Sequence, residues 1–251
     1  VEIQSPPLIQ ILQEINKPEL KIITLEDPIE YRIAGVEQTQ VNEESGYTFS
    51  RGLRSILRQD PDIVLIGEIR DTDTAETAMH AALTGHLVLT TLHTNDAVGS
   101  IPRLIDMGVR PYIITPAVNL VIAQRLVRKV CVHCREEYLI ADDERARIRA
   151  IMKGVRRDVF DPATLEAPSL TLARAKGCAQ CNDTGYRGRT GVFEIFAMKD
   201  ELERLTLESA DTIRLKEAAM KQGMTTITQD AILKVLDKIT SLEEAARVGE
   251  T

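Results

Sequence analysis

Short apolar runs alternate with segments of helical periodicity along the first part of the chain. Three runs rich in β-branched residues or leucine are predicted to be strands, namely Lys21–Leu25, Ile63–Ile66 and Leu87–Leu92. Four segments are predicted to be helices, namely Leu8–Ile15, Phe49–Leu57, Thr72–Leu83 with Thr72 or Asp73 as its cap, and Asn95–Met107. This alternation is typical of an α/β fold, a mostly parallel sheet with flanking helices.

The run Ile63–Ile66 is followed, two residues on, by a carboxylate in a position typical of a ligand-binding or catalytic residue. It is too short for an ordinary helix and apolar on both faces, as expected of a strand inside a parallel sheet. Gly67 allows a turn, and Glu68 then lies at the carboxyl end of the strand, where open α/β sheets bind ligands. A carboxylate there can hold Mg²⁺ through water or polarise the water that attacks a phosphate, so the run indicates a nucleotide hydrolase.

The other two predicted strands also carry polar groups near their ends. Glu26, Asp27 and Glu30 follow the first strand, and Pro28 prevents that strand from continuing. His86 precedes the third strand and His93 follows it. Singly, an acidic residue after a strand is usually a helix cap and a histidine is usually a surface or core group. Three such groups at one edge of one sheet are harder to explain as caps.

Composition changes after Val130. Residues 131–190 contain all four cysteines and a charged helical segment, Asp142–Lys153, whereas Lys199–Val248 reads as helical with a break at Gly223. We therefore expect a nucleotide-binding core at 1–130, a metal-binding insert at 131–190 and a helical C-terminal region at 191–251.

The cysteines form two Cys-x-x-Cys pairs, Cys131 with Cys134 and Cys178 with Cys181. Two such knuckles complete a tetrahedral shell of four sulfurs, the usual structural zinc site. Disulfides, or reduced thiols without metal, are the alternatives. The N-terminus lacks the basic and apolar regions of a signal peptide, which favours metal over disulfides. His133 is expected to be exposed rather than a ligand.

Charge and hydropathy narrow the possible partners. The 251 residues are 43% hydrophobic and 27% charged with a net charge of −7, which argues against nucleic acid as the main partner. No stretch approaches the ~20 apolar residues of a membrane span, so membrane contact is expected only through another protein. The basic group Arg125, Arg128, Lys129 and Arg135 is interpreted as a solvated or subunit-facing surface.

Three stretches resemble motifs of the secretion-superfamily ATPases of type II secretion and type IV pilus extension. Ile23–Tyr31 resembles their Asp box, Leu65–Asp71 their Walker B element and Thr84–Asp96 their His box. The resemblance covers about Ile11 to Val248. It implies a RecA-like, homo-hexameric motor that hydrolyses ATP with Mg²⁺ to assemble a pseudopilus or pilus, with a structural Zn²⁺ in the tetracysteine insert. It also implies a cytoplasmic protein associated with the inner membrane through a platform protein and a cytoplasmic linker protein.

The resemblance assigns roles to the residues of these motifs. Glu68 would activate water and assist Mg²⁺, while Glu26 and Glu30 would lie near the metal and the γ-phosphate. His93, with His86 as a second candidate, would sense the γ-phosphate.

Arginines supply the expected phosphate-neutralising charge. Arg54, Arg58 and Arg70 would neutralise phosphate within or across subunits, surface ion pairing being the alternative, and Asp27 is a further candidate at the nucleotide.

The chain departs from the family in one respect, because no G-x-x-x-x-G-K-[ST] phosphate loop occurs in it. The strand that feeds that loop is also missing, which would leave two strand edges unpaired. We therefore expect a piece of a longer protein, with residues 1–7 from elsewhere in the parent, in preference to a natural pseudo-ATPase. Little or no ATPase activity is expected of these 251 residues alone.

Two other functions fit parts of the sequence. One is a non-catalytic, zinc-stabilised module that docks to a secretion partner or a nucleic acid. The other is a DNA-transfer ATPase of the same superfamily.

Overall fold

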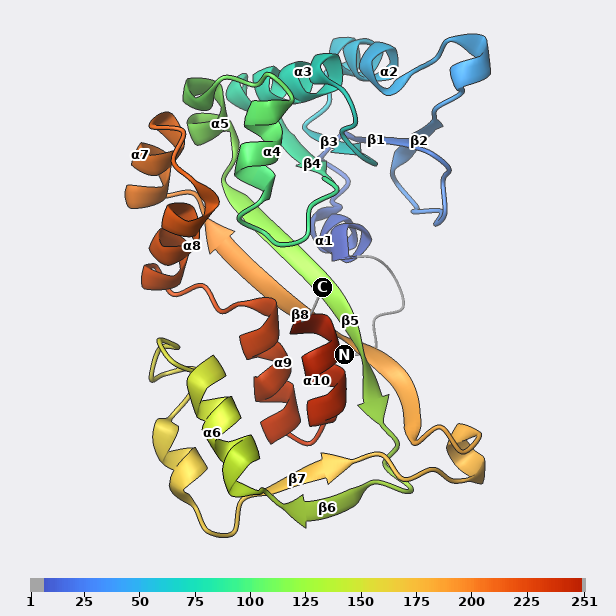
Figure 1. Ribbon diagram of the computed structural model, residues 1–251. Helices are drawn as coiled ribbons and strands as arrows, with labels where there is room; N and C mark the ends of the chain where they lie inside the picture. The colour runs from blue at the N-terminus through green and yellow to red at the C-terminus, as the bar shows by residue number, and fades with distance from the viewer. Residues whose placement is uncertain (1–6, 250–251) are drawn as a thin grey trace.

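A parallel sheet of four strands, in the order β2-β1-β3-β4, lies at one end of the molecule (Figure 1). The computed structural model describes residues 7–249, so of the segment 1–7 only Pro7 is described. The strands are β1 Ile22–Glu26, β2 Glu37–Gln40, β3 Ile63–Ile66 and β4 Leu87–Thr90. The three predicted strands are confirmed. β2 is not among the predictions because its sequence, Glu37-Gln-Thr-Gln40, has no apolar face.

Strand β3 is the centre of this sheet. Its Ile63 pairs with Ile22 of β1 on one side and with Leu87 of β4 on the other, and all four of its residues are buried. Both faces are covered by helices, as expected for a parallel sheet. Helix α1 packs Ile9 and Leu12 against one face, and the larger hydrophobic cluster, which contains the buried residues of α2 and α3, covers the other.

The helices of this half begin and end close to where their periodicity predicts. Their bounds are α1 Pro7–Ile15, α2 Phe49–Ile56, α3 Thr72–Leu83, α4 Ser100–Asp106 and α5 Pro111–Ala117, with 3-10 turns η1 Glu43–Ser45 and η2 Leu57–Gln59.

Two details differ from the expectation. The N-cap of α3 is Asp71, not Thr72 or Asp73, because its carboxylate accepts hydrogen bonds from both the backbone N–H and the hydroxyl of Thr74, at 2.8 and 2.9 Å. Helix α4 begins at Ser100 rather than Asn95. The N–H groups of Ala97 and Gly99 are instead bound by the side chains of Glu194 and Asp96, so residues 94–99 form a loop.

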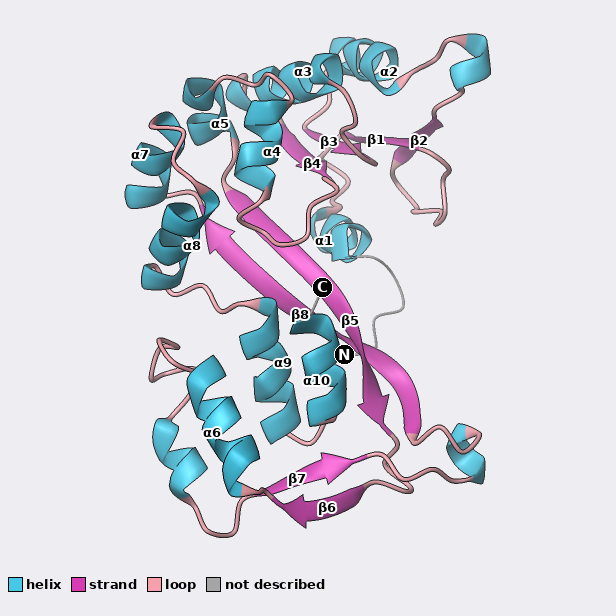
Figure 2. Ribbon diagram, viewed as in Figure 1, coloured by secondary structure: helices cyan, strands magenta, loops and turns pink. Residues whose placement is uncertain are grey.

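A long antiparallel ribbon of β5 (Leu120–Val130) and β8 (Tyr186–Ala197) runs from the sheet to the opposite end of the molecule (Figure 2). A short antiparallel pair, β6 (Glu136–Leu139) and β7 (Thr171–Arg174), lies at that far end. The remaining helices flank the ribbon; they are α6 Asp142–Ile151, α7 Glu201–Leu207, α8 Thr212–Lys221, α9 Ile227–Leu236 and α10 Leu242–Gly249, with 3-10 turns η3 Pro162–Glu166 and η4 Ala179–Cys181.

Hydrophobic packing joins the three expected regions, residues 1–130, 131–190 and 191–251, across their boundaries. Phe196 and Leu215 belong to the same buried cluster as the helices of the parallel sheet. A second cluster joins Ile148 and Leu172 of the cysteine-containing segment to Ile232 of α9. The C-terminal helices therefore stabilise both ends of the molecule.

Strands β4 and β5 each have an open edge within the described residues. β4 pairs only with β3, and β5 pairs only with β8, within residues 7–249. Leu87 of β4 and Leu120 of β5 are 45% and 54% exposed. Among these same residues no helix has the length and hydropathy needed to span a bilayer.

Gly52 of α2 provides a test of this packing. A Cβ at this position would lie 2.8 Å from Cδ1 of the fully buried Leu25 on β1. We expect Gly52→Ala to lower the free energy of unfolding by about 1–2 kcal/mol, because the clash outweighs the roughly 1 kcal/mol gain in helix propensity. Urea denaturation measures this value, with Ser55→Ala in the same helix as control. An increase in stability for Gly52→Ala would contradict the close packing of α2 on β1.

Candidate active site and candidate metal site

Glu68 is the centre of a charged cluster at the carboxyl end of the parallel strands. One carboxylate oxygen accepts a hydrogen bond from Arg70, and the other lies 2.9 Å from Nε2 of His93. Arg70 also lies 4.0 Å from the carboxylate of Asp27. The ends of β1, β3 and β4 thus each supply a charged or imidazole group to one network.

Backbone contacts hold Glu68 in this position. The N–H of Gly67 donates to the carbonyl of Leu25 at 2.8 Å, which extends the pairing with β1 beyond β3. On the other side, Thr91 accepts a hydrogen bond from the N–H of Ile69 at 3.1 Å, and its hydroxyl donates to the carbonyl of Gly67 at 2.6 Å. The residues before and after Glu68 are therefore fixed from both neighbouring strands.

This environment keeps Glu68 ionised at neutral pH. The hydrogen bond from Arg70 lowers the pKa of the Glu68 carboxyl, burial opposes that effect, and His93 lowers the pKa further. The side chain of Glu68 is 13% exposed, whereas those of Arg70 and His93 are 53% and 82% exposed. An anionic ligand can therefore reach both basic groups from solvent.

Glu26 lies at the same edge but faces a different set of partners. Its carboxylate is buried and accepts hydrogen bonds from the hydroxyl of Thr24 at 2.5 Å and from the amide of Gln38 at 3.0 Å. Gln38 also binds the loop after β1, through the carbonyl of Tyr31 and the N–H of Ile33. Glu26 thus anchors that loop to β2 and makes no hydrogen bond or ion pair with the Glu68 cluster in the described chain.

Four other candidates are not brought into this network. Glu30 is exposed and makes no hydrogen bond or ion pair within the described residues. Arg54 on α2 pairs with Asp73 at 3.6 Å, and Arg58 is exposed after α2. His86 precedes β4, at the opposite end of that strand from His93, and its Nδ1 lies 2.9 Å from the carbonyl of Ala81. The geometry gives no support to a role for His86 beside Glu68.

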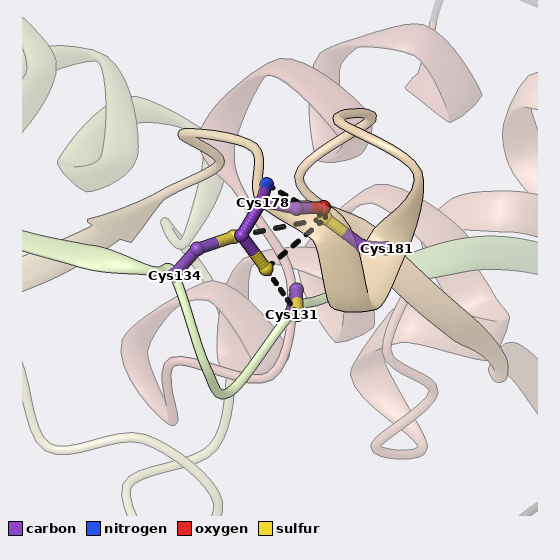
Figure 3. Close-up of side chains that lie close together, drawn as sticks. All are labelled: Cys131, Cys134, Cys178 and Cys181. Atoms are coloured by element: carbon purple, nitrogen blue, oxygen red, sulfur yellow. Dashed lines mark hydrogen bonds between the residues drawn. The ribbon is translucent and has the colours of Figure 1, made fainter.

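The four cysteines meet at the far end of the β5–β8 ribbon (Figure 3). Their sulfur atoms all lie within 4.8 Å of one another, and the distances from Cys178 to Cys181, from Cys134 to Cys181 and from Cys131 to Cys178 are 3.7, 3.8 and 4.0 Å. Four sulfurs about 2.3 Å from a zinc ion in a tetrahedron are separated by about 3.8 Å. The thiols are free, and the donor set therefore fits a tetrahedral metal ion. His133 is exposed beside them, as expected.

Two of these thiols differ in acidity. Burial raises the pKa of the Cys134 thiol to about 11. Burial also opposes ionisation of Cys181, but backbone N–H groups of Cys178 and Gly185 donate to its sulfur and hold its pKa at about 7. Since a metal ion binds thiolates, one ligand of the set is already close to its binding form at neutral pH.

Two polar side chains, the half-buried Gln38 and the buried Glu194, were not predicted from the sequence. Gln38 gives no usable signal, because it lies in an all-polar strand. Glu194 does give one, because it replaces an apolar residue in the alternating buried series Val192, Glu194 and Phe196 of β8.

Comparison with known proteins agrees with this architecture. Residues 5–247 match the model of a protein family described as type II/IV secretion system protein. The chain is 47% identical to the type II secretion system ATPase E of Vibrio cholerae over 98% of this chain and 46% of that protein. It is 43% identical to the type IV pilus assembly ATPase PilB of Myxococcus xanthus over 99% of this chain and 42% of that protein. The chain therefore spans a little under half the length of these relatives.

Solved structures show the same fold. The crystal structure of the pilus retraction motor PilT with bound ADP superimposes with a TM-score of 0.67 and 25% identity, over 98% of this chain and 58% of that one. The structure of the ATPase DotB of Legionella pneumophila superimposes with a TM-score of 0.62 and 21% identity, over 97% of this chain and 56% of that one.

The pairing of Glu68 with Arg70 can be tested through stability. A carboxylate whose pKa is lowered on folding contributes stability above its unfolded pKa, and that contribution disappears as the pH falls through its folded pKa. We expect Arg70→Gln to lower the melting temperature by about 1–3 °C at pH 7, a small effect because Arg70 is half exposed, and by less at pH 3. Differential scanning calorimetry at both pH values checks this, with the exposed Arg58→Gln as control. A loss of equal size at both pH values would exclude the ionic contribution.

Proposed function

This chain belongs to the type II/IV secretion system protein family, and on this basis we propose that it is the ATP-hydrolysing part of a longer motor protein. The motor would drive assembly of a type II secretion pseudopilus or a type IV pilus. The observation that carries the proposal is the ionised Glu68 at the carboxyl edge of the sheet, hydrogen-bonded to Arg70 and to His93. The reaction is ATP + H₂O → ADP + phosphate.

Each member of the cluster has a role in this reaction. Glu68 accepts a hydrogen bond from the attacking water and orients it toward the γ-phosphate. Arg70 and His93 are the exposed donors that meet the developing negative charge on the phosphate oxygens. Mg²⁺, when bound, supplies further neutralisation of the phosphate charge, with Glu68 and the acidic residues after β1 as its candidate holders.

Arg70 and His93 also restrain Glu68 before nucleotide binds. Each contacts a different oxygen of the Glu68 carboxylate, so both oxygens already have a partner. A triphosphate would compete for the same two donors, and their movement toward it would free a carboxylate oxygen for water. The cluster therefore links the arrival of nucleotide to activation of the general base.

The phosphate loop of such a motor would lie in another part of the longer protein. No Gly-Lys-Ser or Gly-Lys-Thr occurs in the 251 residues, and the relatives are about twice as long. The open edges of β4 and β5 support a strand entering from that part. We propose that the 251 residues alone have little or no ATPase activity.

Zinc would stabilise the far end of the β5–β8 ribbon. Cys131 directly follows β5, and Cys178 and Cys181 precede β8, so one ion would fasten the open end of the pair. With four sulfur ligands no coordination position remains for substrate, and the ion is structural.

We further propose a homo-hexamer in the cytoplasm that reaches the inner membrane through a platform protein and a linker protein of the machine. Arg54 and Arg58, which face solvent on and after α2, are then candidates to complete the nucleotide site of a neighbouring subunit.

The catalytic assignment is tested in the full-length protein. We expect Glu68→Gln to reduce kcat for ATP about 100-fold or more, because the side chain keeps its shape but no longer accepts a proton from water. Phosphate release assays measure this, with the exposed Glu19→Gln as the matched control. Turnover by Glu68→Gln within about threefold of the wild type would remove Glu68 from the mechanism.

The metal assignment is tested on the purified 251-residue chain. We expect one zinc per chain by elemental analysis, and loss of that zinc with a lower melting temperature in Cys178→Ser. Mutation of His133 to Ala should leave the zinc in place, because its side chain is exposed and outside the sulfur cluster. Metal-free wild-type protein with four freely reactive thiols would contradict the site.

A further inference from the structure

The loop that follows His93 is held by the C-terminal half of the chain. Ala97 donates its N–H to the carboxylate of Glu194 on β8 at 3.0 Å. The carbonyl of Asn95 accepts a hydrogen bond from Arg125 of β5 at 3.3 Å. Residues 94–99 are therefore attached to the β5–β8 ribbon at two points, although they lie close in sequence to the catalytic cluster.

Glu194 is an unusual residue for this position. It is 1% exposed and lies on the inner face of β8, between the buried apolar residues Val192 and Phe196. Burial raises the pKa of its carboxyl, while the N–H groups of Ala97 and of Ile227, the first residue of α9, favour the charged form. A buried carboxylate is costly unless it accepts hydrogen bonds, and here the backbone N–H of Ala97 donates to it from another element.

Helix α8 contacts the same loop. Lys216 lies 3.8 Å from the carboxylate of Asp96, and Asp96 in turn accepts a hydrogen bond from the N–H of Gly99 at 2.8 Å. The loop is thus connected to β8 and α8, and β8 is in turn bound to α9, where Asp230 accepts a hydrogen bond from the N–H of Phe193 at 2.8 Å.

We propose that Glu194 is a positioning residue that sets the place of His93 and couples it to helices α8 and α9. This inference rests on the proposed function. When His93 moves toward or away from the γ-phosphate, the loop 94–99 moves with it, and Glu194 transmits that movement to β8 and, through the hydrogen bond between Phe193 and Asp230, to α9. The same contact, in the other direction, lets the C-terminal helices determine how well His93 reaches the nucleotide.

Two substitutions separate reach from charge at this position. Glu194→Asp keeps the charge but is shorter by one methylene, about 1.5 Å, so its oxygen no longer reaches the N–H of Ala97. Glu194→Gln loses the charge but keeps an acceptor oxygen at the original length. Glu244→Asp is the matched control, because Glu244 is also 1% exposed and accepts a backbone hydrogen bond at 3.0 Å, but from Arg128, which is outside the loop 94–99.

The first readout is hydrogen exchange of the 251-residue chain, which needs no ATP. We expect Glu194→Asp to accelerate exchange in residues 94–99 about tenfold and Glu194→Gln to change it less than about threefold. The control Glu244→Asp should accelerate exchange only near Arg128 and α10. Unchanged exchange at 94–99 in Glu194→Asp would overturn the proposal.

The second readout is ATP turnover by the full-length protein. We expect Glu194→Asp to lower kcat about 10- to 100-fold with KM for ATP within about threefold of the wild type, because misplacement of a catalytic group affects the chemical step. Glu194→Gln and Glu244→Asp should retain kcat within about threefold. Equal losses in Glu194→Asp and Glu244→Asp would overturn the proposal.

The two readouts also distinguish this inference from the proposed function. Turnover that does not depend on Glu68 would contradict the proposed function, while the exchange data would still report on the Glu194 contact. Turnover that depends on Glu68 but not on the reach of Glu194 would overturn this inference alone.

Discussion

The position of strand β3 is the constraint on which the rest of the site depends. All of its residues, Ile63–Ile66, are buried, and it pairs in parallel with β1 on one side and β4 on the other. A slip of the register would expose apolar side chains and break hydrogen bonds on both edges, so the strand has one stable position. That position fixes Glu68 just beyond the strand, with the ends of β1 and β4 beside it.

A series of polar contacts connects this edge of the sheet to the β5–β8 ribbon, and hydrophobic clusters surround these contacts. Glu68 is restrained by His93, whose loop is bound by Glu194, and Glu194 lies on the ribbon that leads to the cysteine cluster. The hydrophobic clusters follow the same route, since Phe196 of β8 packs with the sheet and Val192 packs with α9. The proposed motor function would need such continuity, because a change at the phosphate would have to alter a surface that acts on a partner.

Several parts of this arrangement could be predicted from the sequence because each depends on local pattern. Buried runs such as Ile63–Ile66 gave the strands, and cysteine spacing gave a sulfur cluster whose geometry fits a metal. Contacts that depend on tertiary folding could not be predicted. The orientation of Glu26 toward Gln38 requires the polar strand β2, and the start of α4 at Ser100 requires Glu194, which lies 97 residues from Ala97. His86 could have been set aside from the sequence, because it precedes the predicted strand that His93 follows, and in the structure only His93 reaches Glu68.

The central claim is that the metal and the nucleotide phosphates bind at the edge defined by Glu68. It is tested most directly by replacing Mg²⁺ with Fe²⁺ in the full-length protein with ATP and mapping the backbone cleavage that iron-generated radicals cause beside the metal. Cleavage is expected near residues 26–27, 67–70 and 91–94, and excess Mg²⁺ should abolish it. ATP-dependent cleavage confined to other parts of the chain would contradict it.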